Sequence, residues 1–591
     1  MFNRSGFGLI LVGLLFSLIG GSLNVVAKSD VDDEAVDVGL RYSVIDPFLD
    51  YPVLPDSKLP MARPDTSVVV TVGRGEYEPA SFVLVAKNLK PIEYSIRVVG
   101  FSGRDNELSN QDVDIRYVSS WYQSSGAWDS QKIKRGEPVL VPELLVNDPD
   151  LIRNDHIAKK SYLKTFVKKD LLYMDISQLS SKNIRMWKKT IIKDASDLQP
   201  IALESGIQQM WITVHVPENY HSGEYAGVIE VKGGAETLYI PLEVNVLPFK
   251  LSKPTLTYSL YYRGRFDPDN NEVSSEYKNE QQLETELKNI VEHGFCCPTL
   301  YQRFVAKYIR DSKGGTKPLI RKHMEFREQA GVDNSQLYYL GLLAPNNPST
   351  LNLINFEKQV KKFGELVKPF GVNDFYIYAV DEAKGEGLLK QLESWESAKR
   401  SGAKIFAAGY ARHVDTMRGR TNLLVFHGKP NIEVANKVHG YGNAIFSYSN
   451  PQSGPENPNL YRANYGYSLL ANEFDGAMIY AYQHGFGNVW NDYDHDIYRD
   501  HVLAYPTTDG VIDTIAWEGL REAVDDVRYF EAYLGSLPDD ERKEMNERFR
   551  QKLRLWFGKT NPVSPAEIRW ELINEILEVT DAQGGISERG S

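Results

Sequence analysis

The chain has 591 residues, of which 42% are hydrophobic, a length and composition that suit roughly two to four domains with substantial cores. Its formal net charge of −12 and the lack of a basic cluster argue against a nucleic-acid partner. The two cysteines, Cys296 and Cys297, are adjacent, which excludes a disulfide framework and a paired-cysteine metal site. The pattern favours two buried reduced thiols, with a vicinal disulfide as the alternative.

The N-terminus has the pattern of a secretory signal peptide. Arg4 supplies a positive charge, residues 7–19 are apolar, and small residues end the segment at Ala27. The apolar run is shorter than the roughly 20 residues that a membrane-spanning helix needs. No cysteine follows it for a lipoprotein anchor. We therefore expect residues 1–27 to be a signal peptide, and the mature chain to be secreted or periplasmic without an integral membrane segment.

Residues 36–250 have the pattern of a β-sandwich domain. Short β-branched runs such as residues 66–72 are separated by Gly, Pro and Asn. Residues 209–216 and 223–231 predict a hairpin of two adjacent strands. The less regular span 121–199 is interpreted as a long excursion from the sandwich.

From residue 251 to residue 515, strand patterns alternate with helix patterns eight times, which is typical of a (β/α)8 barrel. The expected strands are residues 255–262, 294–301, 336–343, 374–380, 404–409, 422–427, 443–447 and 476–482. Apolar residues then recur every three to four positions, so residues 516–582 are expected to form helices packed on the barrel. The predicted class is thus a multi-domain β plus α/β fold.

Two adjacent acids, Asp381 and Glu382, directly follow the fourth expected strand. Like charges this close oppose joint ionisation, an arrangement that acid/base chemistry on a glycosidic bond can use. An acidic pair that opens a helix would also interact well with the helix dipole, so the pair alone does not establish a catalytic role. In barrels, however, catalytic groups sit at the C-terminal ends of strands.

Other expected strand ends carry polar and aromatic residues that are candidates for binding a saccharide. Trp490, beside Asn491 and Asp492, has the character of a platform for the apolar face of a sugar. For each single residue, an ordinary packed or solvated loop position is the alternative. The candidate substrate-binding residues are Arg263, Tyr301, His427, Tyr480, Tyr482, Trp490 and Asp492.

A metal site is the competing interpretation of the acids and histidines after the eighth expected strand. Their spacing matches no ligand motif, so no metal and no other cofactor is expected. The residues concerned are His484, Asp492, Asp494, His495 and Asp496.

Taken together, these motifs resemble glycoside hydrolase family 123 over nearly the whole mature chain. Residues 73–84 and 211–227 are similar to the N-terminal β-domain of that family, and residues 378–383 match its strand-end Asp-Glu pair. Residues 517–529 resemble its helix after the barrel.

The resemblance implies a β-N-acetylgalactosaminidase that acts on a glycan or glycoconjugate with retention of configuration. In that family the acetamido oxygen of the sugar attacks its own anomeric carbon and forms an oxazolinium intermediate. The match makes Glu382 the general acid/base and Asp381 the residue that orients the acetamido N–H and balances its charge. Adjacent residues cannot easily face each other across a sugar ring, as a conventional acid and nucleophile about 5 Å apart must.

Two alternatives remain open from the sequence. One is a hydrolase of another exported polysaccharide that uses a conventional carboxylate nucleophile from another strand. The other is a carbohydrate-binding protein without catalytic activity, against which the intact Asp-Glu pair counts.

Overall fold

The computed structural model describes residues 39–58, 66–103, 108–134, 136–177, 190–304, 308–310, 316–346, 348–557 and 563–587. The expected signal peptide, residues 1–27, lies outside these ranges. From Gly39 onward the chain forms one compact unit. The boundaries expected at residues 250 and 515 therefore stay predictions. No helix in the described ranges is both long enough and apolar enough to cross a lipid bilayer.

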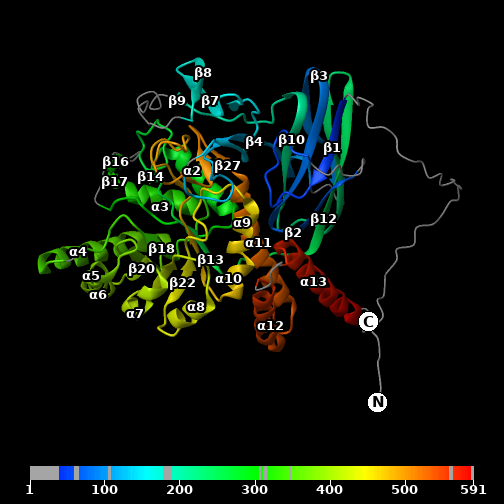
Figure 1. Ribbon diagram of the computed structural model, residues 1–591. Coiled ribbons are helices and arrows are strands. Elements are labelled where there is room, and N and C mark those ends of the chain that lie inside the picture. The colour runs from blue at the N-terminus through cyan, green and yellow to red at the C-terminus, as the bar shows by residue number, and fades with distance from the viewer. Residues whose placement is uncertain are drawn as a thin grey trace. The chain divides into compact units, whose positions relative to one another are not determined.

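The N-terminal part is built on one eight-stranded sheet, in the order β2-β12-β11-β3-β10-β4-β5, with β1 paired to β3 (Figure 1). Its strands are β1 (Gly39–Ile45), β2 (Val68–Arg74), β3 (Glu76–Gly103), β4 (Val113–Gln123), β5 (Val139–Val146), β10 (Ile201–Val216), β11 (Gly223–Gly233) and β12 (Glu236–Lys250). Side chains alternate across it: Val68 and Val70 are buried, whereas Val69 is 53% exposed. The inward-facing residues of these strands share one hydrophobic core.

The expected hairpin of residues 209–216 and 223–231 is wrong, because β3 lies between β10 and β11. The 28 residues of β3 pair first with β10 and then with β11. The actual hairpin joins β11 to β12 through Gly234, whose φ of +56° suits a tight turn.

The expected excursion over residues 121–199 returns partly to the main sheet through β5 and otherwise forms a small sheet of its own. That sheet contains β6 (Ile152–Asp155), β7 (Lys160–Val167), β8 (Asp170–Asp175) and β9 (Thr190–Ile191).

The chain after residue 250 forms a parallel sheet of seven strands in the order β13-β23-β22-β21-β20-β19-β18. Its strands are β13 (Thr257–Leu260), β18 (Gln336–Tyr339), β19 (Asp374–Tyr378), β20 (Lys404–Gly409), β21 (Leu423–Phe426), β22 (Ala444–Ser447) and β23 (Gly476–Ile479). Helices connect them: α2 (Glu280–Glu292), α3 (Leu319–Gln329), α4 (Thr350–Val367), α5 (Gly385–Leu389), α6 (Leu392–Arg400), α7 (Val414–Met417), α8 (Ile432–His439), α9 (Pro458–Tyr465) and α10 (Tyr467–Ala471).

The segment expected as the second strand, residues 294–301, is not a regular strand, so the predicted eight-stranded barrel is reduced to seven regular strands. Pro298 lacks an N–H group and interrupts the ladder there. Backbone hydrogen bonds still link the segment to both neighbours. Thr299 N donates to Leu260 O of β13 at 3.0 Å, and Leu340 N, directly after β18, donates to Leu300 O at 2.9 Å. Cys296 N donates to Tyr258 O of β13 at 3.0 Å, and Leu300 N donates to Tyr338 O of β18 at 2.8 Å. Both cysteines of this segment are free thiols.

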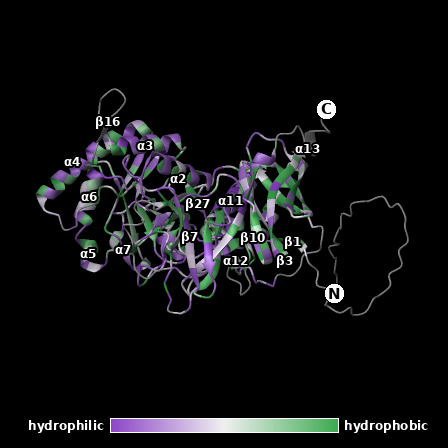
Figure 2. Cartoon of the chain, turned by 90° about the horizontal axis from the view of Figure 1, so that it is seen from above, coloured by the Kyte–Doolittle hydropathy of each residue, from purple (hydrophilic) through white to green (hydrophobic). Residues whose placement is uncertain are grey.

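The connecting helices carry hydrophilic and hydrophobic residues together (Figure 2), as helices with one buried face do. In α4, Leu353, Phe356, Val360, Phe363 and Val367 are buried at three- and four-residue spacing. The remaining short strands pair as β14 (Arg265–Phe266) with β15 (Tyr277–Lys278), β16 (Tyr308–Arg310) with β17 (Thr316–Pro318), β24 (Gln483–His484) with β25 (His501–Val502), and β26 (Ala504–Pro506) with β27 (Val511–Asp513).

Three helices end the chain: α11 (Ile515–Ser536), α12 (Asp539–Phe557) and α13 (Pro565–Ser587). The side chain of Thr514 accepts a hydrogen bond from Trp517 N and caps the start of α11. Helix α11 buries its charged residues as well as its apolar ones. This burial requires that the charges find partners within the protein.

Arginines of other helices are the partners of the buried carboxylates of α11, and acids of the β-domain bind to one of the same arginines. Arg569 of α13 lies 2.7 Å from an oxygen of Asp526, 2.9 Å from one of Glu522 and 3.0 Å from one of Glu78. Arg462 of α9 bonds Asp526 through two nitrogens, at 3.0 and 2.9 Å. Burial raises the pKa of nearby Glu76 to about 7. The cluster therefore joins the β-domain to the helical part through buried charges.

We expect Arg569→Met to lower the free energy of unfolding by about 3–5 kcal/mol, because it leaves buried carboxylates without their cation. Urea denaturation would measure the change. As a control, Arg97→Met removes the exposed ion pair with Glu230, in which the arginine is 68% exposed, and should cost less than about 1 kcal/mol. Equal losses in the two variants would contradict the structural role of the buried cluster.

Candidate active site

The C-terminal ends of the parallel strands open into a cavity of about 790 Å³. The residues that directly follow six of the seven strands line it. They are Tyr261 after β13, Leu340 after β18, Tyr410 after β20, His427 after β21, Tyr448 after β22 and Tyr480 after β23. Asp381 and Glu382, just beyond the end of β19, lie in the same lining.

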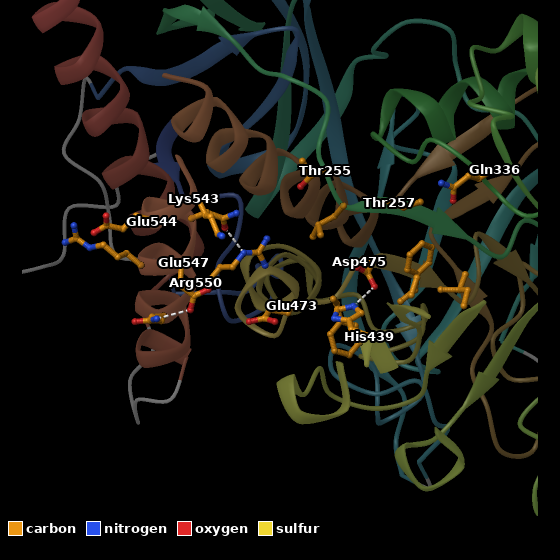
Figure 3. A pocket seen from close by; sticks show the side chains of 18 of the residues that line it. Thr255, Thr257, Gln336, His439, Glu473, Asp475, Lys543, Glu544, Glu547 and Arg550 are labelled. Atoms are coloured by element: carbon orange, nitrogen blue, oxygen red, sulfur yellow. Dashed lines mark hydrogen bonds and ion pairs between the residues drawn. The ribbon is translucent and has the colours of Figure 1, made fainter. Parts of the chain in front are cut away.

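A larger cavity, of about 1240 Å³, lies at the opposite ends of the strands (Figure 3). Gln336 at the start of β18 and Asp475 before β23 line it, together with Lys543 and Arg550 of α12. His439 Nε2 donates to Asp475 Oδ2 at 2.9 Å there. Because parallel α/β sheets bind ligands at the carboxyl ends of their strands, the smaller cavity is the candidate active site.

The carboxylate of Asp381 is held by Tyr378, the last residue of β19. The Tyr378 hydroxyl donates a hydrogen bond to Asp381 Oδ1 at 2.6 Å. Solvent reaches Asp381, but the surrounding protein displaces much of the water and raises its pKa. The hydrogen bond from Tyr378 opposes this increase, and the neighbouring charge of Glu382 adds to it.

Glu382 is held from a different strand end. The hydroxyl of Tyr410, after β20, donates a hydrogen bond to Glu382 Oε2. The backbone of Glu382 has a φ of +42°, in the left-handed region that non-glycine residues rarely adopt. Strain of this kind costs on the order of 1–3 kcal/mol and clusters at functional sites. Adjacent acids are thus fixed separately, one by Tyr378 and the other by Tyr410.

Aromatic rings form a wall of the cavity. The ring centroid of Tyr261 lies 5.2 Å from that of Tyr480 and 5.9 Å from that of Tyr448. His427 lies 4.7 Å from the ring of Tyr410. Such rings can stack on the apolar face of a sugar and offer a hydroxyl beside it.

Arg263 and Tyr301 lie on the side of the cavity that follows β13. Arg263 Nη1 donates to the Tyr480 hydroxyl at 3.2 Å, and its guanidinium lies 5.5 Å from the ring centroid of Tyr301. Tyr480 also bonds His484 Nδ1 at 2.8 Å. Burial lowers the pKa of His484 to about 3, so this imidazole is neutral near pH 7.

The structure therefore brings six of the sequence candidates into one cavity: Asp381, Glu382, Arg263, Tyr301, His427 and Tyr480. The sequence analysis did not select four lining tyrosines, Tyr261, Tyr378, Tyr410 and Tyr448. Each lies in or directly after an expected strand. The signal that could have identified them was an aromatic residue at the end of an expected strand.

Three other candidates lie outside the cavity lining, which corrects the expectation that they contact substrate. The Tyr482 hydroxyl donates to Asn289 Oδ1 at 2.9 Å in the interior. Trp490 is fully buried, donates to Pro506 O at 2.9 Å, and belongs to the hydrophobic core of the β-domain. Asp492 pairs with Arg499 Nε at 2.5 Å. A tryptophan that fills a core cannot serve as an open sugar platform.

One group of possible metal ligands occurs in the described residues, His293, Asp513 and Glu518, with ligand atoms within 4.8 Å of one another. None of them lines the cavity. Glu518 already forms an ion pair with Arg521 and lies 3.2 Å from His293 Nε2. Asn289 donates to Asp513 at 2.8 Å. Protein groups thus already satisfy the charge and hydrogen bonds of this cluster.

The sequence matches no protein-family model and no curated protein. Two solved glycosidase structures match weakly, both at 10% identity and a TM-score of 0.29, which is too low to indicate a shared fold. They are xylanase 10B from Thermotoga maritima, over 47% of this chain and 96% of its own, and the endo-β-1,4-mannanase from Thermotoga petrophila, over 46% and 77%.

A much fuller match is the structure of a family 123 glycoside hydrolase from Clostridium perfringens, studied for glycolipid glycan hydrolysis. It covers 93% of this chain and 99% of its own, with a TM-score of 0.60 and 14% sequence identity. The chain therefore has the fold of a family 123 glycoside hydrolase.

Proposed function

We propose that this protein is an exported glycoside hydrolase that releases a β-linked N-acetylhexosamine, expected to be N-acetylgalactosamine, with retention of configuration. The observation that carries the proposal is the adjacent pair Asp381 and Glu382 at the C-terminal end of β19, with each carboxylate held by its own tyrosine. The signal-like pattern of residues 1–27 supports export.

The arrangement of acids favours the acetamido group of the substrate as the nucleophile. A conventional retaining enzyme needs two carboxyl groups about 5 Å apart on opposite sides of the sugar. Asp381 and Glu382 are the only carboxylic acids among the described residues that line the cavity. No third acid in that lining is therefore placed to attack from the opposite face.

In the first step, Glu382 donates its proton to the glycosidic oxygen while the acetamido oxygen bonds to the anomeric carbon. The bond to the leaving group breaks, and an oxazolinium ion forms. Asp381 accepts a hydrogen bond from the acetamido N–H and balances the positive charge. Tyr378 bonds Asp381 Oδ1, so Oδ2 is available for this contact.

In the second step, the Glu382 carboxylate takes a proton from water, and the oxygen of that water bonds to the anomeric carbon. The bond to the acetamido oxygen breaks, which restores the acetamide. Two displacements at one carbon leave the configuration unchanged. The hydrogen bond from Tyr410 keeps Glu382 on one face of the sugar in both steps.

The proposal is tested with chromogenic β-glycosides of N-acetylgalactosamine, N-acetylglucosamine and galactose, assayed on the wild-type protein. The galactoside should react at least about 10³-fold more slowly than the N-acetylgalactosaminide, because it lacks the internal nucleophile. Proton NMR should show the β-anomer as the first product. Cleavage of the galactoside at a similar rate, or a first product of inverted configuration, would exclude the acetamide as nucleophile.

Glu382→Gln should lower kcat on a substrate with a poor leaving group by about 10²–10⁴-fold, because the general acid is lost. A dinitrophenyl glycoside needs no protonation to depart and should lose much less in the first step. Glu386→Gln is the matched control, since Glu386 is an exposed acid of the helix α5 that follows Glu382. Small and equal losses on both substrates would show that Glu382 is not the acid.

Tyr378→Phe should move the acidic limb of the pH profile of kcat/KM to higher pH. Asp381 acts as its anion, and the Tyr378 hydrogen bond lowers its pKa, so removal of the hydroxyl raises that pKa further. Activity is then lost sooner as the pH falls. Tyr410→Phe, which frees Glu382 instead, should leave this limb closer to that of the wild type. An unchanged acidic limb in Tyr378→Phe would show that this limb does not report the ionisation of Asp381.

A further inference from the structure

The candidate cavity carries more positive than negative side chains, although the whole chain has a net charge of −12. Lys132, Arg263, Arg265 and Arg303 line it, against the two carboxylates of Asp381 and Glu382. We call Arg263, Arg265 and Arg303 the arginine cluster. Arg263 and Arg265 lie 5.5 and 5.9 Å from the Tyr301 ring centroid, and Arg303 is two positions further along the chain.

These cations do not serve to neutralise the catalytic acids. Within the described part of the chain, Asp381 and Glu382 take hydrogen bonds from the hydroxyls of Tyr378 and Tyr410 and form no ion pair. The arginine cluster is thus a separate feature of the same cavity.

The positive charge of the cluster is only partly balanced. Arg263 and Arg265 share a single carboxylate, that of Glu276, which lies 3.0 Å from Arg265 Nη1. The Nε atoms of both arginines are buried and have no hydrogen-bond partner among the described residues. Arg303 is exposed and, like Lys132, has no acidic partner in the described ranges. The two buried Nε donors are costly to leave without an acceptor, whereas water solvates the exposed cations.

We infer that the glycan substrate carries an anionic group, a sulfate ester or a carboxylate, that binds at the arginine cluster. Guanidinium groups bind both anions through parallel charge-assisted hydrogen bonds. Tyr301 would stack on the sugar that bears the anion. This inference rests on the proposed function, because it names the substrate class of the same cavity.

The first test compares matched substrates of the wild-type protein. The carboxylate arm is a disaccharide of β-N-acetylgalactosamine linked to glucuronic acid, compared with the same disaccharide ending in glucose. The sulfate arm is an aryl N-acetylgalactosaminide with and without a sulfate ester. We expect kcat/KM to be about tenfold higher for the anionic member of at least one pair. The arm that responds identifies the anion. Raising salt from about 50 to about 500 mM should reduce this preference.

The second test removes the cations that have no partner. Arg303→Gln and Lys132→Gln should each reduce the ratio of the anionic to the neutral rate severalfold, and Arg303→Lys should restore part of it. Lys358→Gln is the matched control, because it removes an exposed cation from α4, outside the cavity. Equal rates within both substrate pairs, or a preference that survives both cavity substitutions, would overturn the inference.

Binding separates failure of this inference from failure of the proposed function. Calorimetry on the Glu382→Gln protein compares the affinity of the glucuronic acid disaccharide with that of its glucose counterpart, and of the sulfated with the unsulfated aryl glycoside. Tighter binding of an anionic member supports the arginine cluster even where no hydrolysis is observed. Equal affinities within both pairs overturn it, whatever the catalytic result. If the wild type hydrolyses none of the substrates, that result contradicts the proposed function alone.

Discussion

Parallel pairing of neighbouring strands is the constraint on which the candidate site depends. In a parallel sheet the carboxyl ends of all strands lie at the same edge. Residues far apart in the chain therefore become neighbours because their strands pair. Tyr261 and Tyr480 are more than two hundred positions apart, yet their rings lie 5.2 Å from each other because β13 and β23 pair directly. The same register places Tyr410 beside Glu382, since β19 and β20 are neighbours. The acid pair is therefore oriented by the sheet as much as by its own loop.

A second constraint acts behind the sheet, where the β-domain meets the terminal helices. Helix α11 buries charged residues that its sequence alone would place in solvent, and Arg569 and Arg462 supply the compensating charges. Buried ion pairs are weak evidence for high stability, because desolvation offsets much of their attraction. They are demanding in geometry, however, since an acid without its cation is strongly unfavourable. The network thus defines how β3, α9, α11 and α13 meet.

Much of the strand–helix order and the location of the acid pair could be predicted from sequence, because hydrophobic periodicity and strand-end polarity are local signals. The sequence does not predict which strands pair with each other. The two halves of β3 pair with different strands, and nothing in residues 209–231 indicates that β3 separates β10 from β11. Likewise, the apolar segment 294–301 has the composition of a strand, but Pro298 interrupts it, and only scattered hydrogen bonds join it to β13 and β18.

The candidate site shows the same division between local and tertiary information. Arg263, Tyr301, His427 and Tyr480 were found because they lie at or near the ends of expected strands, whereas Trp490 and Asp492 were chosen for their chemical type within a loop. Composition could not reveal that Trp490 packs against Trp121, whose ring centroid is 6.1 Å away, or that Asp492 has Arg499 as its partner. Trp121 lies several hundred positions before Trp490 in the chain, and Arg499, although it is near Asp492 in sequence, becomes its partner only through the folded conformation of the loop.

The burial of Trp490 has a consequence for how the protein can be divided. The chain between β23 and α11 contributes Val489, Trp490, Val502 and Tyr505 to the hydrophobic core of the β-domain. The same stretch supplies His484, Phe486, Tyr498 and His501 to the wall of the cavity. One face of this connection thus packs in the core of the β-domain, while its other face lines the cavity at the parallel sheet. A fragment starting after residue 250 would expose Trp490 to water and lose the support of that wall, so the parallel sheet and its cavity do not form a self-sufficient catalytic module.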